Sequence, residues 1–470
     1  MAKIHAMMDI GKRSMLNSQT ALQTVSHNIA NKTTEGYSRQ RVDTVTAPPI
    51  QEGRLQLGMG ARASQVSRVN NPFLEKQIQN ETGSKGFLQG QADALSRVEQ
   101  VFNEQLNKGL SHYVSDFFNA YRELSNNPES TTTRTAVKEA AEAMTADFKR
   151  VDDQLTTVQK DIDIQVQAGI VEINAISKEI ATLNKDIVQV EMQGIPANDQ
   201  RDRRDFLVKQ LHEKIDVRVA EGDRGAISVS TAGNALLVSG LDHTELVTYS
   251  GGVDNRVQIY ARPSEAHPPF LITDRIKGGT LGGVIKVRDT VIDSVRERVD
   301  SLAYKMAGEV NDAHRQGFDR TGKPTGFFFD PMGGVQGAAK AISVTNEISN
   351  DVNRIATAAK TNAPGDGSIA NVISMIQFKE VMDGDTATMN DFYNAQVGRV
   401  GVMAQTAVRA RDAQDNILLQ VTKLRESVSG VSLDEEATKM LEFQKTFDAS
   451  ARLIRTADEM FDTVLNLKRM

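Results

Sequence analysis

Residues 4–29, IHAMMDIGKRSMLNSQTALQTVSHNI, place apolar side chains at a spacing of seven, and this stretch decides the fold that we expect. A seven-residue apolar repeat is typical of a coiled coil, and small residues in one row allow two helices to approach closely. We expect the helix to end near Asn31, because Thr33, Thr34 and Gly36 favour a turn. One row consists of Met8, Met15, Leu22 and Ile29, and the companion row consists of Ile4, Gly11, Ser18 and Val25.

The other end of the chain carries a repeat of the same period. Its rows are Met440, Phe447, Ile454 and Phe461, with Phe443, Ser450, Ala457 and Val464 as companions. The simplest interpretation is that the two termini pack together and that the middle of the chain loops out from them. We therefore predict a terminal coiled-coil domain made of residues 1–36 and 434–470.

The pattern between the termini changes several times. Residues 37–70 alternate polar and apolar side chains and include Pro48 and Pro49, which favours a β-hairpin. Helical periodicity then runs from Pro72 to about residue 130, and the longest run covers 131–193, about 90 Å at ~1.5 Å per residue. It resumes near Arg288, breaks in the glycine-rich stretch 317–337, and is expected for the rest of the chain.

Residues 206–285 differ from both neighbours, because pairs such as Val217 and Val219 or Val257 and Ile259 alternate with polar residues between glycines. This pattern predicts a small β domain inserted in a helical protein. The fold class that follows is mainly α with an inserted β domain. A helical rod domain with a β-hairpin would comprise residues 37–205 and 286–433.

Composition excludes several classes of function. The 470 residues carry a net charge of −6, which gives no electrostatic attraction to nucleic acid or anionic membranes. There is no cysteine, so disulfides and thiolate-bound zinc are excluded. No apolar run approaches 18 residues, so no transmembrane helix is expected. The first residues lack the apolar core of a secretory signal, and we expect export, if it occurs, without a cleaved signal peptide.

Residues able to carry catalysis or ligand binding are scattered. The seven histidines form no metal-binding spacing, and the glycine tract 278–283 lacks the lysine of a phosphate-binding loop, so a turn before a helix is favoured. The stretch beginning at Asp319 resembles a calcium loop without its last glutamate. The charged run 199–205 is expected to be a solvated ion-pair network rather than an acid–base pair. We predict no enzyme activity, no cofactor and no metal.

The terminal heptads have a consequence for assembly. A lone pair of helices cannot bury every apolar residue of both rows, and burial of about a dozen side chains does not offset the entropy lost by ordering about 60 residues. We hypothesise that the terminal helices are mobile in the monomer and become ordered beside copies from neighbouring subunits.

Several segments resemble a known family. Residues 26–40, SHNIANKTTEGYSRQ, resemble the N-terminal motif of flagellar rod, hook and hook-associated axial proteins, and the ending GYSRQ is similar to the hook-associated protein 1 family. Residues 429–436, SGVSLDEE, and 443–461, FQKTFDASARLIRTADEMF, are similar to the C-terminal signature of that family. Residues 198–211 and 278–289 also match, so the resemblance covers nearly the whole chain.

This resemblance implies a structural subunit that joins hook to filament. It implies export by the flagellar type III apparatus, secretion to the flagellum, and a ring of copies at the distal hook end. The implied partners are other copies of the chain, hook protein, hook-associated protein 3 and an export chaperone. Combined with the heptads, it predicts an assembly interface that contains Met8, Met15, Leu22, Asn28, Ile29, Asn31, Gly36, Tyr37, Leu433, Met440, Phe443, Phe447, Ile454 and Phe461.

Three alternatives stay open at this point. Another axial subunit, such as a distal-rod or hook protein, shares part of the N-terminal motif. An enzyme carried on the flagellum would need a metal or carboxylate cluster within 206–285. An adhesin could use the surface of the β domain as an added role.

Overall fold

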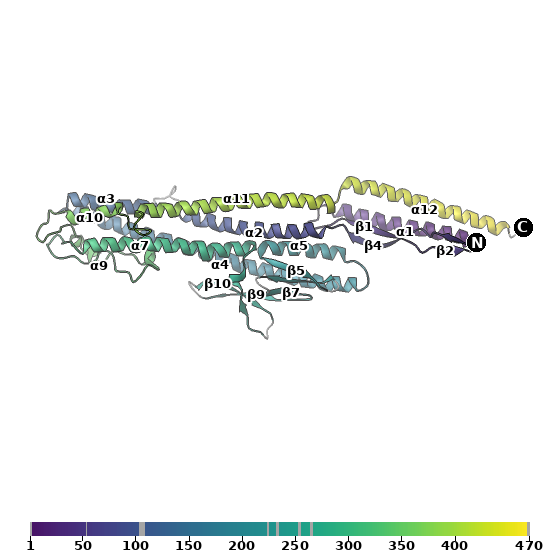
Figure 1. Cartoon of the computed structure of the whole chain (residues 1–470), viewed down its shortest axis with the longest axis horizontal. Coiled ribbons are helices and arrows are strands. Elements are labelled where there is room, and N and C mark those ends of the chain that lie inside the picture. The colour runs from purple at the N-terminus through teal and green to yellow at the C-terminus, as the bar shows by residue number, and fades with distance from the viewer. Residues whose placement is uncertain are drawn as a thin grey trace.

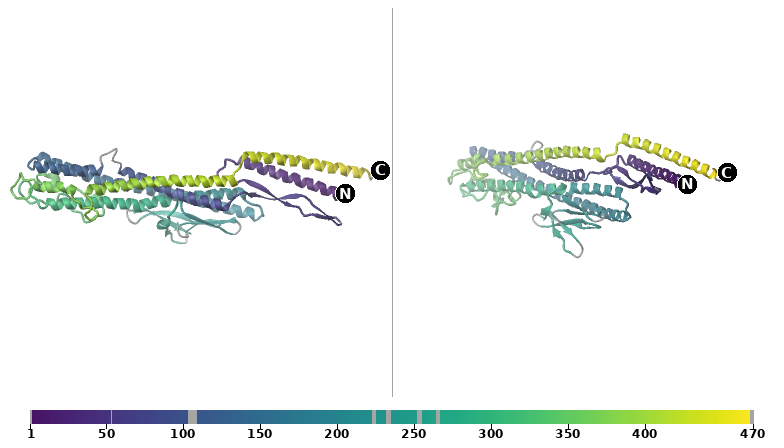
Figure 2. Two further views of the ribbon diagram at one scale, coloured as in Figure 1. Left: turned by 45° about the horizontal axis from the view of Figure 1, so that its top comes forward. Right: turned by 45° about the vertical axis from the view of Figure 1, so that its right-hand side comes forward.

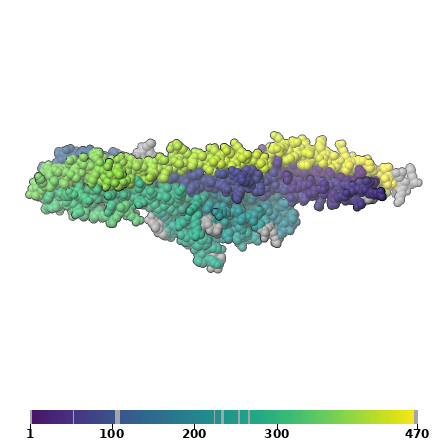
Figure 3. Space-filling view, in the orientation of Figure 1, coloured from purple at the N-terminus to yellow at the C-terminus, as the bar shows by residue number. Residues whose placement is uncertain are grey.

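The chain folds into a long rod with a thinner pair of helices at one end (Figures 1 and 3). The computed structural model describes residues 2–52, 54–102, 109–222, 225–231, 235–251, 255–263 and 267–467. Helices dominate this part of the chain, and the strands form small antiparallel sheets. The predicted fold class, mainly α with an inserted β region, is therefore confirmed.

The two chain ends lie side by side at one end of the rod, as the matching heptads predicted. Helix α1 (Ala2–Ala30) packs along α12 (Leu433–Leu467), and both termini lie at the same tip (Figure 1). The chain reaches α12 through Gly430, where α11 (Met389–Ser429) ends. A Cβ at Gly430 would collide with the carbonyl oxygen of Glu426, so this break between the two helices requires glycine.

The predicted hairpin is present and follows α1. Strand β1 (Gln40–Thr46) pairs antiparallel with β4 (Ala61–Arg68), and the short strands β2 (Ile50–Glu52) and β3 (Leu55–Leu57) pair at its tip. Asn17 of α1 fixes the hairpin, because its amide donates to the carbonyl of Ala61 at 2.8 Å and accepts the N–H of Ala63 at 2.8 Å.

The rod itself is a bundle around one continuous apolar core. Its longest member, α4 (Thr131–Glu191), has 61 residues, as its periodicity predicted, and Ser130 caps its first turn. Within the described residues, the helical run predicted from Pro72 to about 130 consists of two helices, one that ends at Val101 and one that begins at Leu110. The bundle contains α2 (Pro72–Val101), α3 (Leu110–Asn126), α5 (Asn198–Lys214), α6 (Gly279–Lys286), the π-helical turn η4 (Val287–Ile292) and α7 (Asp293–His314).

Close backbone contact explains the glycine tract at 278–283. The expectation of a turn before a helix is met only at Gly278, the N-cap residue, because residues 279–283 already belong to α6. A Cβ at Gly90 of α2 would lie 2.5 Å from the carbonyl oxygen of Thr280, and one at Gly283 would collide with Phe87. Helix α2 therefore lies directly on the first turns of α6, at a separation that larger residues do not allow.

Two small sheets project from the side of the rod (Figures 2 and 3). Asn184 of α4 donates to the carbonyl of Ile227 at 2.8 Å, and Asn174 donates to that of Leu246 at 2.7 Å, so α4 holds both sheets. One sheet contains β5 (Val217–Glu221), β6 (Ile227–Thr231), β7 (Ala235–Ser239) and β8 (Asp242–His243), and the other contains β9 (Glu245–Ser250), β10 (Val257–Arg262) and β11 (Phe270–Leu271).

The division into three domains stays a proposal. The strands lie between residues 217 and 271, whereas the boundaries proposed at 206 and 285 fall inside α5 and α6. Since both helices pack on α2, we propose to count them with the rod. The terminal domain is kept as residues 1–36 and 434–470.

The expectation that helix continues after residue 337 is wrong for 338–388. This stretch holds only short pieces, because left-handed residues such as Asn362, Asp383 and Asp385 interrupt the helical hydrogen bonds. It caps the far end of the rod over Phe328 and Phe329, which contact Phe117. The pieces are α8 (Ala338–Ala341), α9 (Asn346–Asn350), η5 (Val352–Arg354), α10 (Ser368–Met375) and η6 (Ile376–Phe378).

Candidate assembly surface and the joint at its base

Small residues make the contact between α1 and α12. Gly11 is so close to α12 that a Cβ there would lie 2.7 Å from Cγ1 of Ile454. Ser450 and Ala457 are buried on the opposite helix, and the hydroxyl of Ser450 donates to that of Ser14 at 2.7 Å. The middle of each companion row, residues 11–25 of α1 and 450–457 of α12, therefore forms the inner seam with the backbones in close approach. Val464, at the end of its row, is 39% exposed.

The rows predicted as the assembly interface flank this seam and keep part of their surface in solvent. All eight of these side chains are half-buried, and the ring of Phe461 contacts His5 at 5.4 Å between centroids. One partner helix covers only one side of each row. The eight residues are Met8, Met15, Leu22 and Ile29 on α1 and Met440, Phe447, Ile454 and Phe461 on α12.

Asn28, Asn31, Gly36 and Tyr37 lie where the terminal helices join the rod, and Asn28 is the centre of this joint. Its side chain is 1% exposed and makes four hydrogen bonds. The amide donates to the carbonyl of Gln40 and to the carboxylate of Glu436, both at 2.9 Å. Its oxygen accepts the hydroxyl of Tyr37 at 2.7 Å and the N–H of Gln40 at 2.9 Å. One amide thus links α1, the following loop, β1 and α12.

Burial sets the protonation of Tyr37. It raises the pKa of the hydroxyl far above its ordinary value, and the nearby carboxylates of Asp199, Asp202 and Glu436 add to the effect. The hydroxyl therefore stays protonated and remains a donor to Asn28 at neutral pH. The other carboxylate oxygen of Glu436 accepts a hydrogen bond from the ammonium of Lys439 at 2.8 Å.

Asn31 and Gly36 shape the loop between α1 and β1. Asn31 donates back to the carbonyl of His27 at 3.0 Å and accepts the hydroxyl of Thr34 at 3.2 Å. Gly36 has φ of +84°, as the sequence indicated, and a Cβ there would lie 2.9 Å from that of Phe206. Leu433, the first residue of α12, is 43% exposed, and Phe443 is half-buried one turn beyond Lys439.

A second group of charged residues ties the same loop to the rod. Asp202 accepts the N–H of Ser38 at 2.9 Å and the guanidinium of Arg68 at 2.7 Å. Arg425 of α11 donates to Ser38 Oγ at 3.0 Å and pairs with Glu75 at 2.8 Å. Burial raises the pKa of Asp202, and Arg68 and the Ser38 N–H act in the opposite direction.

These contacts correct the expectation of a solvated network at 199–205. Asp202 and Arg204 are 6% and 3% exposed, whereas Asp199 and Arg203 are open to solvent. Arg204 donates to the carbonyl of Gly225 at 2.6 Å, so the run joins the rod to the β region as well as to the loop. The sequence pattern of alternating charges contains no signal for this burial, because the partners are distant in the chain.

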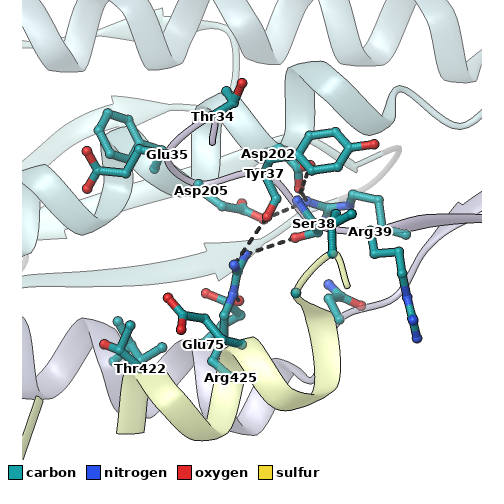
Figure 4. Close-up of a pocket in the computed structure, with 18 of the residues that line it drawn as sticks. Thr34, Glu35, Tyr37, Ser38, Arg39, Glu75, Asp202, Asp205, Thr422 and Arg425 are labelled. Atoms are coloured by element: carbon teal, nitrogen blue, oxygen red, sulfur yellow. Dashed lines mark hydrogen bonds and ion pairs between the residues drawn. The ribbon is translucent and has the colours of Figure 1, made fainter. Parts of the chain in front are cut away.

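A polar cavity of about 860 Å³ lies inside the joint, between the loop 32–39 and the end of α11 (Figure 4). Figure 4 shows Arg425 reaching from α11 toward Ser38, with Asp202 behind the loop. Basic and acidic side chains alternate around the space, and most of the charged ones already bond to one another. The cavity separates the terminal helices from the rod without a continuous apolar core between them.

Neither a metal centre nor a membrane span is found in the described part of the chain. No group of three or more His, Cys, Asp or Glu side chains there could hold a metal ion. The carboxylate of Asp319, at the calcium-like stretch, accepts N–H groups of Thr321 and Lys323 at 2.7 and 3.0 Å within its own turn. No helix within the described ranges has the length and apolar character that crossing a membrane requires.

Comparison with known proteins places this architecture. The family model "Flagellar hook-associated protein FlgK helical domain" matches residues 95–329, half of the chain. The chain belongs to the flagellar hook-associated protein FlgK family. A second model, "Flagellar basal body rod FlgEFG protein C-terminal", matches residues 426–467 and thus covers α12 and the end of α11.

Full-length relatives of this FlgK-family chain carry the same name. Flagellar hook-associated protein 1 of Bacillus subtilis is 28% identical over 98% of this chain and 97% of the relative. The protein of that name from Salmonella typhimurium is 25% identical over 96% and 98%. The solved flagellar hook junction protein FlgK from Burkholderia pseudomallei has the same fold, with a TM-score of 0.69, 15% identity, and coverage of 75% of this chain and 100% of that one. The FlgK-family chain is thus a structural component of the bacterial flagellum.

Proposed function

We propose that this chain joins hook to filament as a ring of identical subunits at the distal end of the hook. The observation that carries the proposal is the pair of half-buried apolar rows on α1 and α12. They lie together at one end of a long rod, and a single partner helix leaves each row partly open. Neighbouring copies that present the same rows would complete their burial, as expected for a subunit that is stable in a tube of many copies.

The partners proposed are hook protein on one side of the ring and hook-associated protein 3 on the other. The names of the relatives, flagellar hook-associated protein 1, support the first contact, and the family resemblance supports the second. We propose that the subunit leaves the cell unfolded through the flagellar type III apparatus after an export chaperone holds its C-terminal helix. A chain without cysteine can pass between redox compartments without cross-linking, which suits this route.

We propose a structural and not a catalytic role for the polar residues of the joint. The hydrogen-bonding groups at the centre of the joint are already paired within the chain. Asn28 bonds to Tyr37 and Gln40, and Asp202 bonds to the loop and to Arg68. A site built for chemistry would keep a nucleophile or an acid aimed at open space. The joint instead fixes how the terminal helices leave the rod.

Deletion of the gene tests the proposed function. Cells without the subunit should make hooks without filaments and should release filament protein into the medium, and expression of the intact chain should restore filaments. Imaging of flagella and assay of the medium measure both effects. Normal filaments on deletion cells would refute the proposal, and loss of the hooks themselves would indicate a rod or hook subunit instead.

A further inference from the structure

The hairpin tip has an apolar face that is largely open to solvent. Ile50 pairs with Leu57 across the tip, so the side chains of Ile50, Leu55 and Leu57 share one face. Ile50 is 49% exposed and Leu55 63%. Two-stranded ribbons are marginally stable in water by themselves, so a cover over this face would stabilise the tip.

A contact with α1 anchors the hairpin below its tip. That contact is at Met59, which is 2% exposed and whose carbonyl accepts Arg13 at 3.3 Å. Figure 2 shows the hairpin running along α1 toward the chain termini. The chain therefore holds the base of the hairpin against α1, while Ile50 and Leu55 at its tip remain exposed.

The chain also has an open trough beside the base of the same hairpin. It measures about 580 Å³, with β1 and α12 as walls and α1 as floor. The floor is made of small side chains, Ser14, Ser18 and Ala21, and the half-buried Val42 and Phe443 line the walls. The floor residues 14–25 span about 17 Å at ~1.5 Å per residue, enough for the end of a narrow hairpin.

A tip cannot enter the trough of its own chain. The part of β1 that lines the trough ends at Thr44, and Ile50 lies six residues further along the same arm of the hairpin. At ~3.3 Å per residue the tip is about 20 Å past the end of the trough. A second copy shifted by roughly that distance along the terminal helices would bring its trough level with the tip.

Charge complementarity favours the same pairing. Arg54 at the turn of the tip is exposed and forms no ion pair with any described residue. Glu442 on the α12 wall of the trough is also exposed, and its carboxylate has no ion-pair partner among the described residues. Each copy thus offers one unpaired cation on the tip and one unpaired anion at the trough.

We propose that the hairpin tip of one copy seats its apolar face in the trough of a second copy, with Arg54 beside Glu442. The inference rests on the proposed function, which brings copies side by side. Because the two surfaces differ, the contact is head-to-tail, and such contacts close into a ring when the rotation between copies allows it.

Cysteine cross-linking tests the contact, since the natural chain has no cysteine. Cells that express Leu55→Cys chains together with Thr446→Cys chains should give disulfide-linked dimers in purified hooks. The matched control pairs Leu55→Cys with Leu441→Cys, because residue 441 lies only about 7.5 Å from 446 along α12 but faces about 140° away from it. We expect at least tenfold more dimer from the Thr446 pair.

The outcomes separate this inference from the function on which it rests. Subunits present on hooks with no excess of the Thr446 cross-link would overturn the inference alone. Absence of the subunit from hooks would overturn the proposed function. In that case the same two variants are purified and mixed at high concentration, and the yield of disulfide-linked dimer shows whether the contact between tip and trough forms. Reversal of one charge, Arg54→Glu or Glu442→Arg, should lower filament retention under shear, and the double reversal should restore it. Failure of the double variant to restore retention would refute the ion pair.

Discussion

Replacement of Asn28 by alanine should loosen the joint by about 3 kcal/mol. The substitution leaves the Tyr37 hydroxyl and the Gln40 N–H without an acceptor, and it takes one donor each from the Gln40 carbonyl and the buried Glu436 carboxylate. Each buried group left unsatisfied costs about 1–3 kcal/mol. Water from the adjacent cavity can replace part of the loss, which keeps the sum near the lower end of the range.

Amide exchange of Gln40 in subunits assembled on hooks, where the terminal helices are expected to be ordered, measures this change directly, because its N–H donates to the lost oxygen. About 3 kcal/mol corresponds to roughly 100-fold faster exchange at this amide. Asn17→Ala is the matched control, since it removes the bonds to Ala61 and Ala63 and should leave Gln40 unchanged. Asn28→Asp should be as damaging as alanine, because its second oxygen faces the Glu436 carboxylate, and Glu436→Gln should restore part of the protection. Exchange at Gln40 that rises less than threefold in Asn28→Ala would refute the reasoning.

Four further predictions concern other parts of the molecule. Gly11→Ala should destabilise the terminal pair by about 1–3 kcal/mol through overlap with Ile454. Gly308→Ala, where a Cβ meets nothing within 4 Å, should instead raise thermal stability. Equal effects of the two substitutions would contradict the close approach of the helices at Gly11. Phe447→Ala should weaken assembly by about 2–5 kcal/mol and the unfolding free energy of the monomer by less, since the ring is only half-buried there; normal filament retention under shear would count against it. Burial lowers the pKa of His314 to about 4. The unfolding free energy should therefore be flat above pH 6.5 and fall by about 3 kcal/mol between pH 6.5 and 4, because the unfolded chain takes up the proton first. Denaturation of the His314→Gln variant should lack this slope. Residues 5–30 and 440–465 should exchange their amides quickly in the purified monomer, and strong protection there would disprove ordering on assembly.

The heptads predicted which segments meet, but not which row makes the contact. Periodicity identifies a face of a helix and gives no distance between two helices. Gly11 and Ser450 lie at the seam because only small side chains permit that separation, and Met15 and Phe447 are consequently displaced to its flanks. The sequence pattern alone would have placed the larger residues in the centre.

The sequence identified several residues of the joint but not the hydrogen bonds between them. Asn28, Gly36 and Tyr37 were identified through resemblance to a family, and Glu436 bonds to Asn28 across 408 residues. No local pattern encodes a partner at such a separation. For the same reason Asp202, Arg68 and Arg425 escaped detection, since their own neighbours in the sequence are those of ordinary exposed charges.

The hydrogen bond between Ser14 and Ser450 joins residues 436 positions apart. Helix α1 leaves the ribosome first, and its partner α12 is synthesised last. At roughly 5–20 residues per second, synthesis of the intervening chain takes about 20–90 s. Throughout that interval the apolar rows of the first helix have no partner within the same molecule. Association between nascent chains on neighbouring ribosomes is therefore most favoured during synthesis.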